Sequence, residues 1–108
     1  MSEFRQEKIT NHVRELAALW IEREGSGASL VTVTRVVLSP DSKYAKILIS
    51  VLPKEKEKAA WGFVRRNLGE MRKYMQERLK INPIPFLEIE IDEGEKNRQK
   101  IDELLNSK

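Results

Sequence analysis

Two apolar runs separated by a short turn, within residues 29–53, constrain the fold more than any other feature of this sequence. The first run, SLVTVTRVVLS, is rich in β-branched residues, and the second, YAKILISVLP, alternates apolar with other side chains. Both patterns are typical of strands. Between them, Pro40 fixes φ and Asp41 can accept hydrogen bonds from nearby backbone amides. The sequence therefore predicts an antiparallel hairpin.

The apolar positions of the two strands predict which side chains face a core. In the second strand they fall on one face: Ala45, Ile47, Ile49 and Val51. In the first strand the alternation changes phase between Val33 and Val36. A change of phase within one strand indicates an extra residue, so we expect a β-bulge at Thr34–Arg35.

Helical periodicity flanks the hairpin. Residues 4–23 repeat apolar side chains at helical spacing, and the helix is expected to end at Gly25. After Pro53, residues 54–80 predict a long basic amphipathic helix that Pro83 and Pro85 terminate. One apolar seam should cover the sheet: Trp61, Val64, Leu68, Met71, Met75 and Leu79.

Gly62 lies in the middle of this long helix, although a glycine there costs roughly 1 kcal/mol relative to alanine. A straight helix of about 27 residues would span roughly 40 Å and overhang a small sheet. We therefore expect a bend at Gly62 that keeps both halves on the sheet. The bare backbone at this position would also let a phosphate of a ligand come close.

The segment FLEIEID, residues 86–92, alternates strictly and predicts a third strand. Its apolar side chains should point inward and its carboxylates outward: Leu87, Ile89 and Ile91 against Glu88, Glu90 and Asp92. The order is α-β-β-α-β, which predicts an α+β domain with a three-stranded sheet covered by helices on one face. We assign residues 1–93 to this domain and residues 94–108 to a C-terminal tail with a short helix.

Composition excludes several classes of protein. The 108 residues suit one domain, and hydrophobic and charged fractions of 40% and 34% suit a folded one. The absence of cysteine excludes disulfides and thiolate sites, and a lone His12 cannot form a histidine metal cluster. We interpret His12 as a surface or half-buried structural residue. The charged N-terminus and the lack of a run of 18 apolar residues predict a cytoplasmic protein.

The positive charge concentrates on one element. Residues 54–80 carry nine Lys and Arg against four Asp and Glu, whereas residues 81–108 carry four against seven. A basic helix of this kind indicates either a nucleic-acid contact or a solvated helix face, and charge alone does not decide between them.

Two other functional classes compete with a nucleic-acid-binding protein. The carboxylates Glu88, Glu90 and Asp92 could indicate an enzyme, but they have no accompanying histidine, cysteine or phosphate loop, and we interpret them as a solvated strand face. We therefore expect neither catalysis nor a bound metal or cofactor. The alternative is a protein-interaction module in which the Met71–Met75 seam pairs with another helix, although the sheet needs that seam as its own cover.

The chain resembles ribosome-binding factor A, a bacterial family of small-subunit assembly factors. Three segments carry the resemblance: LVTVTRVVLSPDSKYAKILISVL (30–52), AAWGFVRRNLG (59–69) and NRQKIDELL (97–105). The resemblance implies a variant KH fold of type II, in which an Ala-x-Gly helix kink replaces the usual Gly-x-x-Gly loop. Ala60, Trp61 and Gly62 match that kink, whereas the GSGAS loop after the first helix departs from the family pattern.

The resemblance also implies a function. The protein would be a cytoplasmic monomer that binds immature small ribosomal subunits and their rRNA, and it would promote late maturation, including processing of the rRNA 5′ end. It would need no membrane and no small-molecule substrate. The basic residues that we expect to contact RNA are Lys58, Arg65, Arg66, Arg72 and Lys73, with Lys43 and Lys46 from the hairpin as weaker candidates. Trp61 could stack on a base, but its place in the apolar seam favours core packing.

Overall fold

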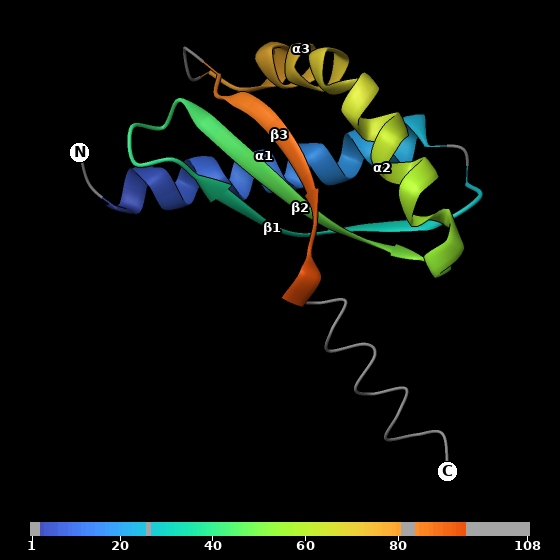
Figure 1. Ribbon diagram of the computed structural model, residues 1–108. Coiled ribbons are helices and arrows are strands. Elements are labelled where there is room, and N and C mark those ends of the chain that lie inside the picture. The colour runs from blue at the N-terminus through green and yellow to red at the C-terminus, as the bar shows by residue number, and fades with distance from the viewer. Residues whose placement is uncertain (1–2, 26, 81–83, 95–108) are drawn as a thin grey trace.

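The computed structural model describes residues 3–25, 27–80 and 84–94 (Figure 1). Its elements follow in the order α1 (Glu3–Glu24), β1 (Leu30–Leu38), β2 (Tyr44–Leu52), a 3₁₀ turn (Lys54–Lys56), α2 (Glu57–Arg66), α3 (Leu68–Arg78) and β3 (Phe86–Ile91). The first helix and the three predicted strands are confirmed within two residues at each end. The predicted tail helix, within residues 95–108, lies outside the described residues.

The three strands form a mixed sheet in the order β1-β2-β3. β1 and β2 are antiparallel, with Leu30 opposite Leu52, and the register shifts between Val33 and Arg35. That shift confirms the predicted bulge. β3 pairs with β2 in parallel, which requires a long crossover, and α2 and α3 supply it.

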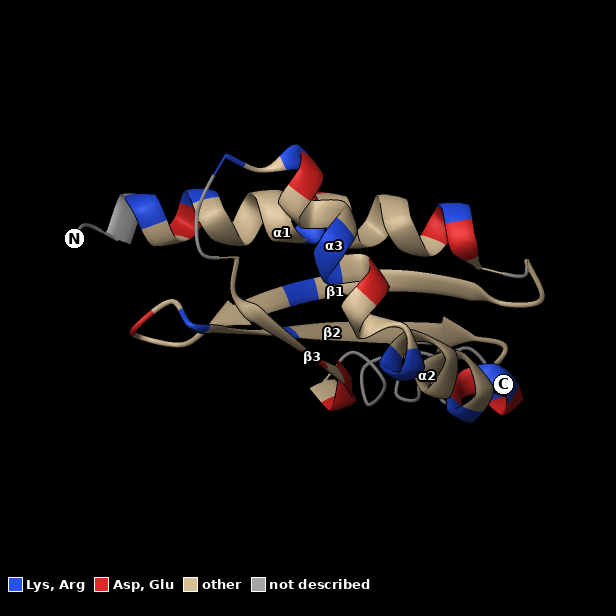
Figure 2. Cartoon of the chain, turned by 90° about the horizontal axis from the view of Figure 1, so that it is seen from above, with Lys and Arg blue, Asp and Glu red and all other residues tan. Residues whose placement is uncertain are grey.

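The helices lie together against the sheet. α1 packs along β1, whereas α2 and α3 cover β2 and β3, and α1 and α3 lie side by side (Figures 1 and 2). One hydrophobic core joins these layers. Its largest fully buried side chains come from the three helices and from β2: Val13, Ile47, Ile49, Val64, Met71 and Met75. The predicted α+β architecture and the predicted apolar seam are both confirmed.

The predicted bend at Gly62 is wrong. α2 runs without interruption through Gly62, and the break lies at Asn67, where φ is −113° and ψ is 17°. The Asn67 side chain donates a hydrogen bond of 2.8 Å to the carbonyl of Phe63, and the backbone carbonyl of Asn67 accepts a hydrogen bond from the amide of Met71 in α3. Asparagine side chains compete with helical backbone bonding in this way, so Asn67 both ends α2 and begins α3.

Asp92 also departs from expectation. The alternation of β3 predicts that it points into solvent, but only 8% of it is exposed. Its carboxylate accepts a hydrogen bond of 2.5 Å from the Thr34 hydroxyl and lies 4.0 Å from Nε of Arg35. The bulge brings these two partners to the end of β3, so the Asp92 carboxylate links the residue after β3 to β1.

Candidate nucleic-acid interface

Four of the predicted basic residues form an exposed group on α2 and α3. Lys58, Arg65 and Arg66 project from α2, and Lys73 projects from α3. Figure 2 marks these basic segments on both helices. Within residues 5–25, 27–80 and 84–94, no carboxylate forms an ion pair with any of the four. We call this group the α2–α3 cations.

The two arginines of this group lie against their own helix. The Arg65 guanidinium carbon is 5.5 Å from the centroid of the Trp61 ring, within cation–π range. Nη1 of Arg66 is 3.1 Å from the point that a Cβ of residue 62 would occupy. The missing side chain of Gly62 therefore leaves room for the Arg66 guanidinium rather than for a bend.

The three residues of the expected kink motif have different surroundings. Ala60 lines a hollow of about 640 Å³ between α2, the end of α1 and the start of β1. Trp61 donates a hydrogen bond of 3.2 Å from Nε1 to the carbonyl of Ile89 in β3, and its ring packs against the core. This supports the packing interpretation of Trp61, and it anchors α2, with its cations, to the sheet.

Of the other three predicted contacts, Lys46 and Arg72 have partners within the domain, and Lys43 is exposed. Nζ of Lys46 lies 2.8 Å from the Glu90 carboxylate, and the hydrogen bond to Glu90 raises the pKa of Lys46 above its usual 10.5. Lys43 is exposed in the hairpin turn. Since both Lys46 and Glu90 are substantially exposed, their ion pair adds little stability.

Arg72 has a structural position. Its Nε donates to the carbonyl of Pro85 at 3.1 Å and its Nη2 to that of Ile84 at 2.6 Å. The same guanidinium lies 4.5 Å from the centroid of the Phe86 ring. Arg72 therefore joins α3 to the segment that precedes β3.

The hairpin turn has its own polar cluster. The Asp41 carboxylate accepts a hydrogen bond of 2.7 Å from the Ser39 hydroxyl and one of 3.0 Å from the Lys43 amide. These two bonds lower the pKa of Asp41 below its usual 3.8. This agrees with the predicted role of Asp41 in the turn.

A further set of cations, on α1 and at the end of α3, was not singled out from the sequence. Arg5, Lys8, Arg78 and Lys80 line one groove between these helices. Reading each helix separately could not find this set, since it exists only because α1 and α3 pack side by side. His12, expected to be a surface or half-buried structural residue, is exposed and lines the same groove.

The described part of the chain offers no metal-binding cluster of three His, Cys, Asp or Glu residues. Among those same residues, no helix is both long and apolar enough to cross a membrane.

Comparison with known proteins gives consistent results. The model of the family described as "Ribosome-binding factor A" matches residues 5–105. A protein of that name from Clostridium botulinum (strain Loch Maree / Type A3) is 30% identical over 111 residues, which cover 99% of this chain and 92% of the relative.

Solved structures show the same fold. The crystal structure of ribosome-binding factor A from Thermus thermophilus superposes with a TM-score of 0.71 at 19% identity, covering 79% of this chain and 92% of that one. A homology model of the Thermus thermophilus protein, fitted into a cryo-electron-microscopy map of a 30S–RbfA complex, superposes with a TM-score of 0.68 at 19% identity, covering 78% and 91%.

Proposed function

The chain belongs to the ribosome-binding factor A family, and we propose that it binds immature small ribosomal subunits by contacting their rRNA. The observation that carries this proposal is the group of α2–α3 cations, which are exposed and have no carboxylate partner in the described residues. Lys and Arg in such a position neutralise phosphates and release counterions. The 30S–RbfA complex described for the Thermus thermophilus protein supports the same partner here.

The geometry of α2 suits a phosphate backbone. Lys58 and Arg65 lie two turns apart, about 10 Å along the helix. Gly62, between them, has no side chain, and the Arg66 guanidinium lies over the helix backbone at this residue. The Trp61 bond to Ile89 fixes α2 to β3, so Lys58, Arg65 and Arg66 project from a helix that is anchored to the sheet.

The proposed role follows from binding alone. Contacts to phosphates stabilise one conformation of the rRNA, and they promote late maturation, including processing of its 5′ end, before the protein leaves. The protein itself makes and breaks no bond, so it needs no cofactor and no small-molecule substrate. We place this activity in the cytoplasm, with the protein acting as a monomer.

The alternative, a protein-interaction module that pairs through its helical seam, is less well supported. Met71 and Met75 are fully buried and Val64 is 1% exposed, so the domain itself already covers the seam. A seam used for pairing would give a dimer in gel filtration, whereas we expect the mass of a monomer.

Co-sedimentation with separated ribosomal fractions tests the proposal. The wild type should pellet with free small subunits and not with large ones, and the Arg65→Glu/Arg66→Glu variant should remain in the supernatant. An Arg14→Glu/Lys54→Glu variant is the matched control, because it changes net charge equally at exposed residues outside the α2–α3 cations, and it should retain the binding. All variants are first checked for folding by circular dichroism.

Each result has a definite meaning. Binding that survives reversal at Arg65 and Arg66 would keep the function but reject the α2–α3 cations as the interface. A wild type that pellets with no fraction, or equally with all of them, would contradict the proposed function.

A further inference from the structure

A groove of about 570 Å³ separates the N-terminal half of α1 from the end of α3. Its apolar floor comes from three side chains: Ile9, Leu16 and Leu79. Its rim is strongly basic: among the described residues it carries Arg5, Lys8, Arg78 and Lys80, together with His12 and the carboxylate of Glu15. Among the described lining residues cations outnumber carboxylates, which makes a surface complementary to an anionic ligand.

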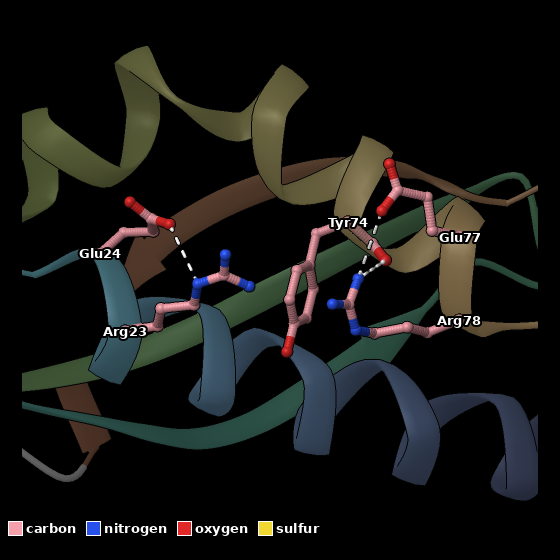
Figure 3. A network of polar contacts seen from close by, with 5 residues as sticks. All are labelled: Arg23, Glu24, Tyr74, Glu77 and Arg78. Carbon is pink, nitrogen blue, oxygen red and sulfur yellow. Dashed lines mark hydrogen bonds and ion pairs between the residues drawn. The ribbon is translucent and has the colours of Figure 1, made fainter.

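The position of Arg78 is fixed by its neighbours. Its guanidinium carbon lies 3.6 Å from the centroid of the Tyr74 ring, and Nη1 donates to the Tyr74 carbonyl at 3.1 Å. Figure 3 shows Tyr74 standing between Arg78 and Arg23, whose guanidinium carbon is 6.0 Å from the ring centroid. Arg78 is therefore preorganised by stacking, which lowers the entropy that it loses on binding a ligand.

The charge of the groove is only partly compensated. Arg78 also lies 3.5 Å from the Glu77 carboxylate, but 62% of the Glu77 side chain is exposed, so this contact is screened by water. Lys8 is exposed and forms no ion pair with any described carboxylate. On α1, residues 5, 8 and 12 share one face over about 10 Å, the length of a short stretch of nucleic-acid backbone rather than of one small ion.

From this geometry we infer that the α1–α3 groove is a second site for the sugar–phosphate backbone of small-subunit rRNA. The inference rests on the proposed function and extends it. The apolar floor accepts the ribose carbons, whereas the basic rim contacts the phosphates, with the stacked Arg78 guanidinium as the fixed point. The RNA-binding surface then consists of two separate basic regions, the α2–α3 cations and this groove.

The test measures the affinity for free small subunits across a series of salt concentrations. A Lys8→Gln/Arg78→Gln variant should bind more weakly, and the slope of log affinity against log salt should fall in magnitude by about 1.5 to 2. Arg14→Gln/Lys54→Gln is the matched control, because it removes the same charge outside both regions and should leave the slope unchanged. Lys8→Gln alone, which breaks no hydrogen bond or ion pair among the described residues, should lower the slope by about 1 even if Arg78→Gln loosens α3.

The outcomes separate this inference from the function on which it rests. If the wild type binds small subunits and both groove variants keep its slope, the inference fails and the proposed function stands. If the wild type does not bind small subunits, the proposed function fails and the inference fails with it. Unchanged slopes together with binding of labelled ATP, abolished by Lys8→Gln/Arg78→Gln, would assign the groove to a free nucleoside phosphate and overturn the inference.

Discussion

Replacing Gly62 with alanine should stabilise the protein. Residue 62 lies inside α2, with regular helix on both sides, and alanine is favoured over glycine there by about 1 kcal/mol. Among the described residues, and apart from the backbone of the helix itself, the atoms within 4 Å of the new Cβ belong to the Arg66 guanidinium, whose Nη1 is 3.1 Å away at the free end of a flexible side chain. Since that end can move at little cost, we expect a net gain of about 0.5–1 kcal/mol in the free energy of unfolding.

Urea and thermal unfolding followed by circular dichroism measure this gain. For a domain of this size it corresponds to a rise in Tm of roughly 2–6 °C. Gly27→Ala is the matched control, because the same atom is added at a residue with φ of +78°. That substitution should destabilise the protein, by about 1 kcal/mol, through backbone strain alone.

The sign of the change in the free energy of unfolding in Gly62→Ala tests this reasoning. If the variant is less stable than the wild type, the reasoning is refuted: either the Arg66 guanidinium cannot move aside or residue 62 is not in regular helix.

Three further predictions concern residues that hold the fold together. Arg72→Gln should lower the free energy of unfolding by about 2–3 kcal/mol, because two carbonyl groups lose a charged donor. The neighbouring Lys73→Gln should leave stability unchanged, and equal urea midpoints for the two variants would contradict the structural role of Arg72. Asp92→Ala should cost about 1–3 kcal/mol in the same assay, whereas no loss would show that its carboxylate is solvated. The turn stabilisation from Asp41 should be complete above its ordinary pKa of 3.8 and disappear as pH falls through its lowered pKa. An NMR titration should therefore give a midpoint below 3.8 that moves back toward 3.8 in Ser39→Ala, and an unshifted midpoint in the wild type would contradict this.

The strands and the core could be predicted from the sequence because their apolar residues recur with a fixed period. Alternation with a period of two identified the inward face of β2, and the change of phase near Thr34 identified the bulge. Helical spacing likewise identified the seam that contains Met71 and Met75, which are fully buried. Such patterns persist because one face of each element must be removed from water.

The position of the break between α2 and α3 could not be predicted from a periodic pattern. Glycine has the lowest helix propensity apart from proline, so propensity pointed to Gly62. At the actual break the Asn67 side chain donates a hydrogen bond to the Phe63 carbonyl, a specific contact that a propensity scale does not include. Propensity is a weak guide wherever a specific side-chain contact competes with it.

Only part of the candidate site could be predicted from the sequence, for a related reason. Charge along the chain identified the α2–α3 cations, but it could not separate them from Arg72, whose guanidinium is bound to the chain before β3. Nor could it reveal the groove between α1 and α3, since Lys8 and Arg78 come together only through tertiary packing.

The central claim is that the α2–α3 cations bind rRNA phosphates on the small subunit. The most direct test compares the salt dependence of small-subunit affinity for the wild type with that of a variant in which all four cations are replaced: Lys58→Gln, Arg65→Gln, Arg66→Gln and Lys73→Gln. Each lost phosphate contact should lower the slope of log affinity against log salt by about 0.7–0.9, so the total change should be about 3. Parallel lines for two equally well folded proteins would contradict the claim.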